Sequence, residues 1–136
     1  MFEEFKEEGF VRPNKPLFLP NKEYSRGLST FVIGCSDIIL ISAEYKERKI
    51  VLVKRKNDPM AGHWWTFGGR MQFGEYADQA AARCFNRETG LNLWPGQFVP
   101  LEKPYIFICK TRVQEPKNAG GHYIVLLHAL TSLQAR

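Results

Sequence analysis

The chain has 136 residues, enough for one globular domain with its own core but not for two. Hydrophobic residues make up 44% and charged residues 24%, an ordinary balance for a globular domain, and the formal net charge is +5. No apolar run approaches the roughly 20 residues that cross a bilayer, so the composition argues against a membrane protein. The lysines and arginines are scattered, which argues against a nucleic-acid partner, whereas a basic surface suits phosphate-bearing ligands.

The N-terminus and the cysteines both indicate the cellular compartment in which the protein is expected. The first ten residues, MFEEFKEEGF, are too charged for a secretory signal. The three cysteines, Cys35, Cys84 and Cys109, are widely spaced and form no CxxC pair. We therefore expect neither a disulfide framework nor a zinc site, and we expect the protein in the reducing cytoplasm.

Taken in chain order, the residues predict an extension followed by a mixed α/β domain. Residues 1–28 contain Pro13, Pro16 and Pro20, which interrupt any regular element there. The expected strands are Ser29–Gly34, Ile38–Ser42, Lys49–Arg55, Tyr105–Thr111 and His122–Thr131. Between them, Asn57–Gly74 is predicted to be a long glycine-rich loop of functional kind, and Tyr76–Thr89 a helix that Gly90 ends. Strands on both sides of a central helix are typical of an α/β domain.

The predicted helix has one apolar face. At about 100° per residue, the residues on that face are Ala77, Ala80, Ala81, Cys84 and Phe85. Glu88 falls in the same stripe, and a carboxylate directed toward a core is costly unless it is paired or bound to a metal. Periodicity alone leaves two interpretations open, a frayed helix end where Glu88 reaches water or a ligand role. Arg83 and Arg87 lie on a neighbouring face, either solvated or directed at phosphates.

The loop before the helix and the helix itself match a known pattern. Gly68-Gly69-Arg70 lets the backbone approach a ligand closely, because glycine has no side chain in the way. Seven positions, at fixed spacings, carry the match: Gly69, Glu75, Arg83, Phe85, Glu88, Gly90 and Leu91. This segment resembles the Nudix box, G-x5-E-x7-R-E-U-x-E-E-x-G-U. The resemblance implies a Nudix-type α/β/α sandwich with a mixed β-sheet, a bound divalent metal, and hydrolysis of a nucleoside-diphosphate-linked substrate.

Two positions depart from the Nudix box. Cys84 stands where the family has the glutamate after the arginine, and Arg87 where it has the first glutamate of the pair. A site with several metal ions needs several oxygen ligands, and Glu88 alone is retained from that cluster. The GDP-mannose mannosyl hydrolase subfamily is similar in this respect. On that resemblance we expect a nucleotide-sugar hydrolase, with water attacking the sugar carbon and a nucleoside diphosphate leaving.

The resemblance implies a role for each matching residue. Glu88 and the carbonyl of Gly68 would bind one Mg²⁺, or Mn²⁺ in its place. His122 would be the general base, and Arg55 and Arg70 would stabilise charge on the leaving diphosphate. The remaining implied roles are substrate contact for Asp37 and support of the loop and helix for Gly69, Glu75 and Arg83. Trp64, in the loop, is expected to stack on a base or a sugar of the substrate.

Two other functions stay open at this point. A Nudix phosphoanhydride hydrolase, acting on a nucleoside triphosphate or ADP-ribose, would need a further base or ligand, and Glu115 is the carboxylate available in the loop from Arg112 to Gly121. A catalytically inactive nucleotide-binding module is the other, motivated by Arg87 within the metal site.

The domain boundaries and the assembly follow from the same resemblance. We expect one Nudix domain over residues 1–136, with a box of loop and helix at about residues 68–91. The sequence stops at Arg136, where relatives usually continue with another strand and a helix. Either the domain is trimmed or a partner subunit completes it. The subfamily resemblance implies a homodimer, in which the phenylalanine-rich N-terminal extension would help cover an exposed edge.

Overall fold

The structure, a computed structural model, describes residues 3–15, 18–43 and 46–132. The domain expected from the sequence spans residues 1–136. Its first two and last four residues lie outside the described residues. The helices are α1 (Asn21–Thr30) and α2 (Ala77–Thr89), with short 3₁₀ turns at η1 (Pro95–Gln97) and η2 (Lys117–Ala119). The strands are β1 (Ile33–Ile41), β2 (Ile50–Val51), β3 (Val53–Lys54), β4 (Trp64–Trp65), β5 (Phe67–Arg70), β6 (Val99–Pro100), β7 (Tyr105–Cys109) and β8 (Gly121–Thr131). None of the helices in these ranges is both long and apolar enough to cross a bilayer.

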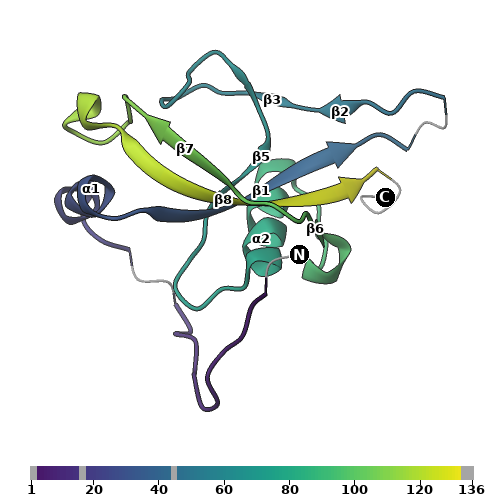
Figure 1. Cartoon of the computed structure of the whole chain (residues 1–136), viewed down its shortest axis with the longest axis horizontal. Helices are drawn as coiled ribbons and strands as arrows, with labels where there is room; N and C mark the ends of the chain where they lie inside the picture. The colour runs from purple at the N-terminus through teal and green to yellow at the C-terminus, as the bar shows by residue number, and fades with distance from the viewer. Residues whose placement is uncertain (1–2, 16–17, 44–45, 133–136) are drawn as a thin grey trace.

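A parallel pair of long strands, β1 and β8, forms the centre of a mixed sheet (Figure 1). Their register places Cys35 opposite Val125 and Ile38 opposite His128. Strands β2 and β5 pair antiparallel with β1, whereas β6 and β7 pair antiparallel with β8. Parallel neighbours need a long crossover between them, and the crossover here contains α2. The expected α/β class and mixed sheet are confirmed.

Helix α2 packs its apolar face on the sheet, as its periodicity predicts. The buried residues of this helix are Ala77, Ala80, Ala81, Ala82, Cys84 and Phe85. The Phe85 ring meets Phe67 of β5 at 5.0 Å and Phe98 at 5.8 Å between centroids, both edge-on, and this aromatic cluster forms the centre of the core. Gly90 adopts φ 76° and its N–H bonds to the carbonyl of Asn86, which ends the helix at the predicted residue.

The two faces of the central strands have different neighbours, because successive side chains of a strand alternate. On one face, Ser36 donates a hydrogen bond to the carbonyl of Ala77 in α2 at 2.7 Å, and its Oγ lies 3.2 Å from Nδ1 of buried His128. On the other face, Cys35 and Asp37 of β1 line a cavity. Alternation therefore divides β1 between the core and an open cavity.

Helix α1 corrects the prediction for the N-terminal region. Residues 21–30 are helical, although the sequence predicted no regular element before residue 28 and a strand over Ser29–Gly34. Pro20 lies at the N-cap, where its missing N–H costs no helical hydrogen bond, so this proline precedes a helix instead of preventing one. Buried Ser25 and Leu28 fasten α1 to the domain, and α1 lies at one end of the sheet (Figure 1).

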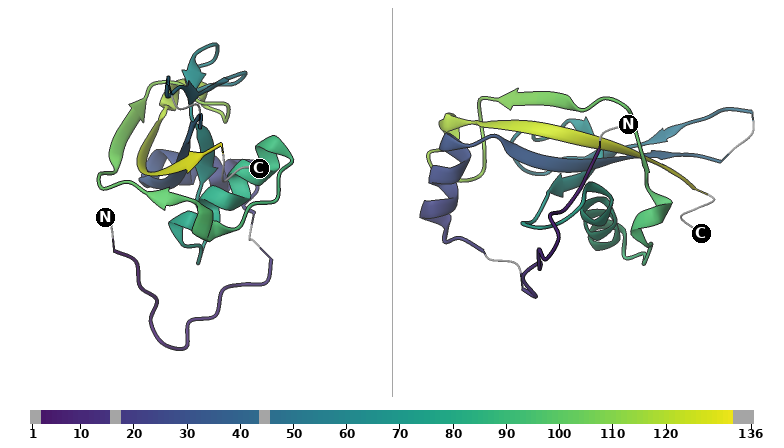
Figure 2. Two further views of the ribbon diagram at one scale, coloured as in Figure 1. Left: turned by 90° about the vertical axis from the view of Figure 1, so that its right-hand side faces the viewer. Right: turned by 60° about the horizontal axis from the view of Figure 1, so that its bottom comes forward.

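The segment before α1 contacts the loop that leads into α2. A carboxylate oxygen of Glu4 accepts a hydrogen bond from the N–H of Ala77 at 2.8 Å, satisfying one of the free donors at the helix start. The ring of Phe10 meets Phe73 edge-on at 5.9 Å, and Arg12 donates to the side chain of Gln72 at 3.1 Å. Figure 2 shows this segment on the side of the sheet that α2 covers.

The predicted loop Asn57–Gly74 contains two strands. Strand β4 pairs with β3 in a small second sheet, and β5 pairs with β1 in the main sheet. The glycines that suggested a loop permit this pairing instead. A side chain at Gly68 would lie 2.5 Å from the carbonyl oxygen of Ser36, so only glycine allows the two strands to approach.

Candidate active site

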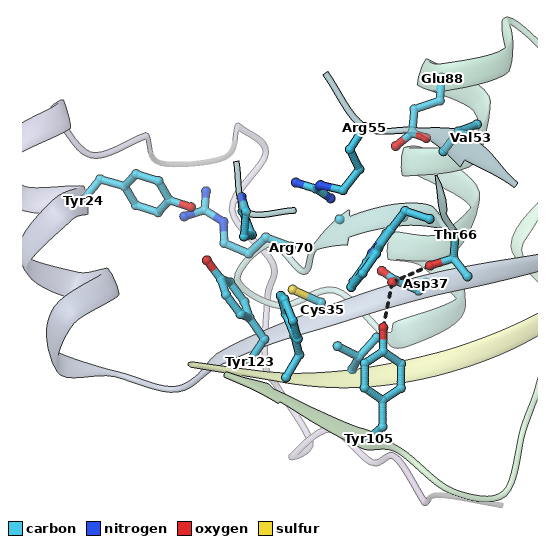
Figure 3. A pocket seen from close by; sticks show the side chains of 16 residues that line it. Tyr24, Cys35, Asp37, Val53, Arg55, Thr66, Arg70, Glu88, Tyr105 and Tyr123 are labelled. Atoms are coloured by element: carbon cyan, nitrogen blue, oxygen red, sulfur yellow. Dashed lines mark hydrogen bonds between the residues drawn. The ribbon is translucent and has the colours of Figure 1, made fainter. Parts of the chain in front are cut away.

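A cavity of about 290 Å³ is lined by residues of the central sheet, of α1 and of the C-terminal end of α2 (Figure 3). Its charged residues are Asp37, Arg55, Arg70 and Glu88, and its aromatic ones are Tyr24, Trp65, Tyr105, Phe107 and Tyr123. Gly68 and Gly69 of β5 form part of its lining. The structure thus brings together Asp37, Arg55, Gly68, Gly69, Arg70 and Glu88, six of the site residues predicted from the sequence.

Gly68 is held between two strands and adopts a backbone angle that favours glycine. Its φ is 146°, and a Cβ at this position would lie 2.3 Å from Oδ1 of Asp37. Gly69, its neighbour, leaves room for the Sγ of Cys84, which would lie 3.1 Å from an added Cβ. The two glycines therefore let the backbone line the cavity between Asp37 and the end of α2.

Glu88 lies at the C-terminal end of α2 and faces the cavity. Its side chain is 29% exposed, and its carboxylate accepts a hydrogen bond from the N–H of Gly68. An Nη2 atom of Arg87 lies 3.6 Å from Oε1 of the same carboxylate. Burial raises the pKa of Glu88, against the lowering effect of the Gly68 N–H and Arg87. The helical periodicity that places Glu88 beside the apolar face of α2 thus also places its carboxylate at the cavity.

Glu75 and Arg83 form a bidentate ion pair behind the cavity. Nε of Arg83 lies 2.6 Å from Oε1 of Glu75, and Nη2 lies 3.0 Å from Oε2. Nη2 also donates to the carbonyl of Arg70 at 2.8 Å, so the pair connects α2 to the end of β5. Arg12 adds a second cation, 3.4 Å from Oε1 of Glu75. These contacts hold the loop in the geometry that places Gly68, Gly69 and Arg70.

Asp37 is a buried carboxylate within the cavity wall, 6% exposed. Its Oδ2 accepts hydrogen bonds from the hydroxyls of Thr66 at 2.8 Å and Tyr105 at 3.3 Å, drawn as dashed lines in Figure 3. Burial raises the pKa of Asp37 to about 6, although both hydroxyls favour the charged form. Burial likewise raises the pKa of the Cys35 thiol, another lining group, to about 12, so this thiol is protonated at neutral pH.

Two arginines and several aromatic rings line the cavity. The guanidinium carbon of Arg55 lies 5.7 Å from the Trp65 ring, and Nε of Arg55 has no hydrogen-bond partner within the described part of the chain. The rings of Trp65 and Phe107 are 5.2 Å apart, and Phe107 and Tyr123 are stacked at 6.1 Å. Guanidinium groups suit phosphate oxygens, whereas a continuous aromatic surface suits a planar base.

Three residues that were candidates for catalysis or substrate contact lie outside the cavity lining. His122 precedes Tyr123 on β8, and alternation directs its side chain to the opposite face from Tyr123 and Val125, which line the cavity. The side chain of Glu115 is 78% exposed and lies 3.8 Å from Lys117. Trp64 is 65% exposed, and its neighbour Trp65 occupies the cavity instead.

The same alternation shows what sequence reasoning missed. Tyr105, Phe107 and Tyr123 reach the cavity because they share the β1 face that carries Asp37, a relation that depends on the pairing of β7 with β8. Tyr24 reaches it from α1, a helix that the sequence did not predict. The alternation of side chains along β8 was the local pattern that could have placed Tyr123 and Val125 on one face.

The donor set of this cavity fits one divalent cation. Two carboxylates, Asp37 and Glu88, line the cavity, and no group of three or more histidine, cysteine, aspartate or glutamate side chains is arranged to hold a metal within residues 3–15, 18–43 and 46–132. Mg²⁺ commonly binds through one or two carboxylates together with substrate phosphates. One Mg²⁺ held by Glu88 and a diphosphate therefore suits these residues, and a site for two or three ions does not.

The fold is a layered α/β domain, and its cavity is lined by glycines and arginines, groups that suit phosphate oxygens. The model of the NUDIX domain matches residues 36–134, so the chain belongs to the Nudix family. An ADP-ribose pyrophosphatase of Methanocaldococcus jannaschii is 32% identical over 85 residues, which cover 62% of this chain and 44% of the relative. The match thus spans less than half of the length of that curated relative.

Solved structures agree with the fold. A MutT/nudix family protein from Enterococcus faecalis superposes with a TM-score of 0.54 at 14% identity, covering 85% of this chain and 50% of that one. The NUDIX domain of Shewanella oneidensis NrtR, solved in complex with ADP ribose, gives a TM-score of 0.51 at 16% identity, with coverage of 79% and 69%. At these identities the likeness shows the shared Nudix fold.

The comparisons do not support the GDP-mannose subfamily. The curated relative is an ADP-ribose pyrophosphatase, an enzyme named for cleaving a diphosphate. The loss of two box glutamates, on which the subfamily resemblance depended, is also compatible with a one-metal site of another specificity. The Nudix assignment itself is confirmed.

Proposed function

We propose that this protein is a divalent-metal-dependent hydrolase of a nucleoside-diphosphate-linked small molecule, with ADP-ribose as the substrate to test first. The observation that carries this proposal is a single cavity in which Gly68 and Glu88 lie beside Arg55 and Arg70, next to an aromatic surface. The glycine, the carboxylate and the two arginines suit a metal-bound diphosphate, and the aromatic surface suits a base or ribose. The similarity to an ADP-ribose pyrophosphatase supports the choice of substrate.

In this proposal each residue has a defined task. Glu88 and the carbonyl of Gly68 would hold Mg²⁺, which when bound polarises a phosphoryl oxygen as a Lewis acid. Arg55 and Arg70 stabilise the charge that develops on the departing phosphate, in a site partly shielded from water. The rings of Trp65 and Phe107 orient the nucleoside part by stacking. Asp37 presents a fixed acceptor to hydroxyl or amino groups of the substrate.

The proposal favours phosphorus–oxygen over carbon–oxygen cleavage. The carbon–oxygen mechanism depended on His122 as the base, and that side chain is directed away from the cavity. In phosphoanhydride hydrolysis, the water oxygen bonds to one phosphorus, the bridging oxygen leaves with the other phosphate, and the water proton is transferred to the products. Hydrolysis of ADP-ribose in this way yields AMP and ribose 5-phosphate.

Hydrolysis in ¹⁸O water tests both the activity and the bond. We expect Mg²⁺-dependent turnover of ADP-ribose with the label in a phosphate group. Label in the sugar would restore the carbon–oxygen mechanism. Glu88→Gln should abolish turnover and weaken Mn²⁺ binding measured by electron paramagnetic resonance. Glu102→Gln, an exposed control outside the cavity, should change neither.

A second candidate function is nucleotide binding without turnover. Its supporting observation is Arg87, whose guanidinium occupies the surroundings of Glu88 where the family pattern has a carboxylate. A cation 3.6 Å from Glu88 competes with a metal for that carboxylate. Tight binding of ADP-ribose without hydrolysis, across a panel of substrates with Mg²⁺ and Mn²⁺, would favour this function.

Two further proposals concern the surroundings of the enzyme. Cys35, Cys84 and Cys109 are free thiols, which supports a reducing compartment such as the cytoplasm. A homodimer stays a prediction from the family resemblance. Sedimentation at several concentrations tests it, and a monomer at every concentration would contradict it.

A further inference from the structure

Helix α1 is attached to the domain through a fully buried arginine. Arg112, 1% exposed, donates from Nη2 to the hydroxyl of Ser25 at 2.8 Å and from Nη1 to the carbonyl of Gly120 at 3.0 Å. The Ser25 hydroxyl also bonds to the carbonyl of Glu115. Burying a guanidinium is costly unless its donors are satisfied, so these bonds fix α1 against the loop before β8. Residue 24, adjacent to this anchor, is held in place with it.

Tyr24 uses this fixed position to contact Arg70. The guanidinium carbon of Arg70 lies 4.5 Å from the centroid of the Tyr24 ring, and both side chains line the cavity. Figure 3 shows the Arg70 guanidinium beside the Tyr24 ring, with Tyr123 nearby. The main chain of Arg70 is held separately, because its carbonyl accepts a hydrogen bond from Arg83. Arg70 is therefore restrained at its backbone by α2 and at its charged end by α1.

We propose that Tyr24 is a positioning residue for Arg70, holding the guanidinium in the cavity before a diphosphate arrives; this inference rests on the proposed function of the site. A long side chain loses conformational freedom when it grips a ligand, and prior restraint reduces that loss. The aromatic face achieves this without an acidic partner. A carboxylate would neutralise the charge that the phosphate needs, whereas a ring leaves the donors of Arg70 free to bind oxygens.

The test compares three variants by calorimetric titration of ADP in the presence of Mg²⁺. Tyr24→Leu keeps apolar bulk but removes the ring, and should weaken ADP binding by about 3- to 10-fold. Tyr24→Phe keeps the ring and should bind within about 2-fold of the wild type. Glu23→Ala, exposed on the same helix and outside the cavity lining, is the matched control and should bind as the wild type does.

A double-mutant comparison separates positioning from general damage. In an Arg70→Met background, Tyr24→Leu should cause no further loss, because the residue acts through Arg70. Thermal unfolding of each variant shows whether α1 stays docked. Equal losses in the two backgrounds would overturn the proposal, as would weak binding by Tyr24→Phe or unchanged binding by Tyr24→Leu.

The outcomes for this inference and for the proposed function are distinguishable. Wild-type protein that binds ADP but hydrolyses no substrate would refute the hydrolase and leave the Tyr24 comparison valid. Wild-type protein that hydrolyses ADP-ribose with a KM and a kcat unaffected by Tyr24→Leu would refute the inference and leave the hydrolase. If ADP does not bind at all, the diphosphate role of Arg70 is wrong, and the inference fails with it.

Discussion

Replacement of Asp37 by asparagine is expected to stabilise the folded protein at neutral pH. The carboxyl group is 6% exposed, and burial raises its pKa from 3.8 to about 6. The folded state therefore binds a proton more tightly than the unfolded chain does. Stability from this group is fully present below pH 3.8 and is lost as the pH rises through about 6.

The size of the effect follows from the same difference in pKa. A shift from 3.8 to about 6 corresponds to about 3 kcal/mol at pH 7 and above. Asparagine carries no charge and its oxygen can accept the hydrogen bonds from Thr66 and Tyr105, but its amide needs a partner of its own. We therefore expect Asp37→Asn to raise the free energy of unfolding by about 1–3 kcal/mol at pH 7.5.

Urea unfolding of metal-free protein between pH 4 and pH 8 measures this gain. The advantage of Asp37→Asn should shrink toward zero at pH 4, because the wild-type carboxyl is then largely protonated in the folded state. Asp58→Asn, an exposed control, should stay within about 0.5 kcal/mol of the wild type at every pH. A variant less stable than wild type at pH 7.5, or a difference that does not vary with pH, would refute the conclusion that burial disfavours the charged form of Asp37.

Three further predictions concern stability. Gly68→Ala should cost at least about 2 kcal/mol in urea unfolding, because the new Cβ would lie 2.3 Å from Oδ1 of Asp37; a loss below about 1 kcal/mol would contradict the close approach. Arg83→Ala should cost about 2–4 kcal/mol, since it leaves the buried carboxylate of Glu75 without its bidentate partner, and an unchanged unfolding midpoint would show that the pair contributes nothing. Burial lowers the pKa of His128, so its contribution is present above about pH 6.5 and is lost as the pH falls below that value. In the Asp37→Asn background, the urea midpoint should decrease as the pH is lowered from 7 to 5. Adding His128→Gln should make this decrease smaller; an unchanged decrease would show that another group causes the pH dependence.

The buried face of α2 and the position of Glu88 were predictable from residue spacing. Both depend on a repeat of 3.6 residues, which brings Cys84, Phe85 and Glu88 near one stripe whatever the rest of the chain does. The family pattern implied a supporting role for Glu75 and Arg83, which form an ion pair in the structure. Local periodicity and spacing were sufficient for these features because the interacting groups lie within one loop and one helix.

Which residue of β8 faces the cavity could not be predicted in the same way. His122 and Tyr123 are neighbours in sequence, and their side chains lie on opposite faces of β8. A shift of one residue in a strand exchanges the two faces, so the face that meets the cavity depends on the register with β1 and β7. The residue type suggested His122, whereas the register places Tyr123 in the cavity lining.

The sequence by itself determined the family, the ends of α2 and the place of Glu88 beside the apolar face of that helix, because these are encoded within about 25 consecutive positions. Only the tertiary structure decided which side chains complete the cavity. Tyr24, Tyr105 and Tyr123 come from three separate elements, and contacts between elements depend on strand register and on the docking of α1 through buried Arg112. Local patterns contain no information about such distant pairings, since a residue's own neighbours do not reveal which strand lies beside it.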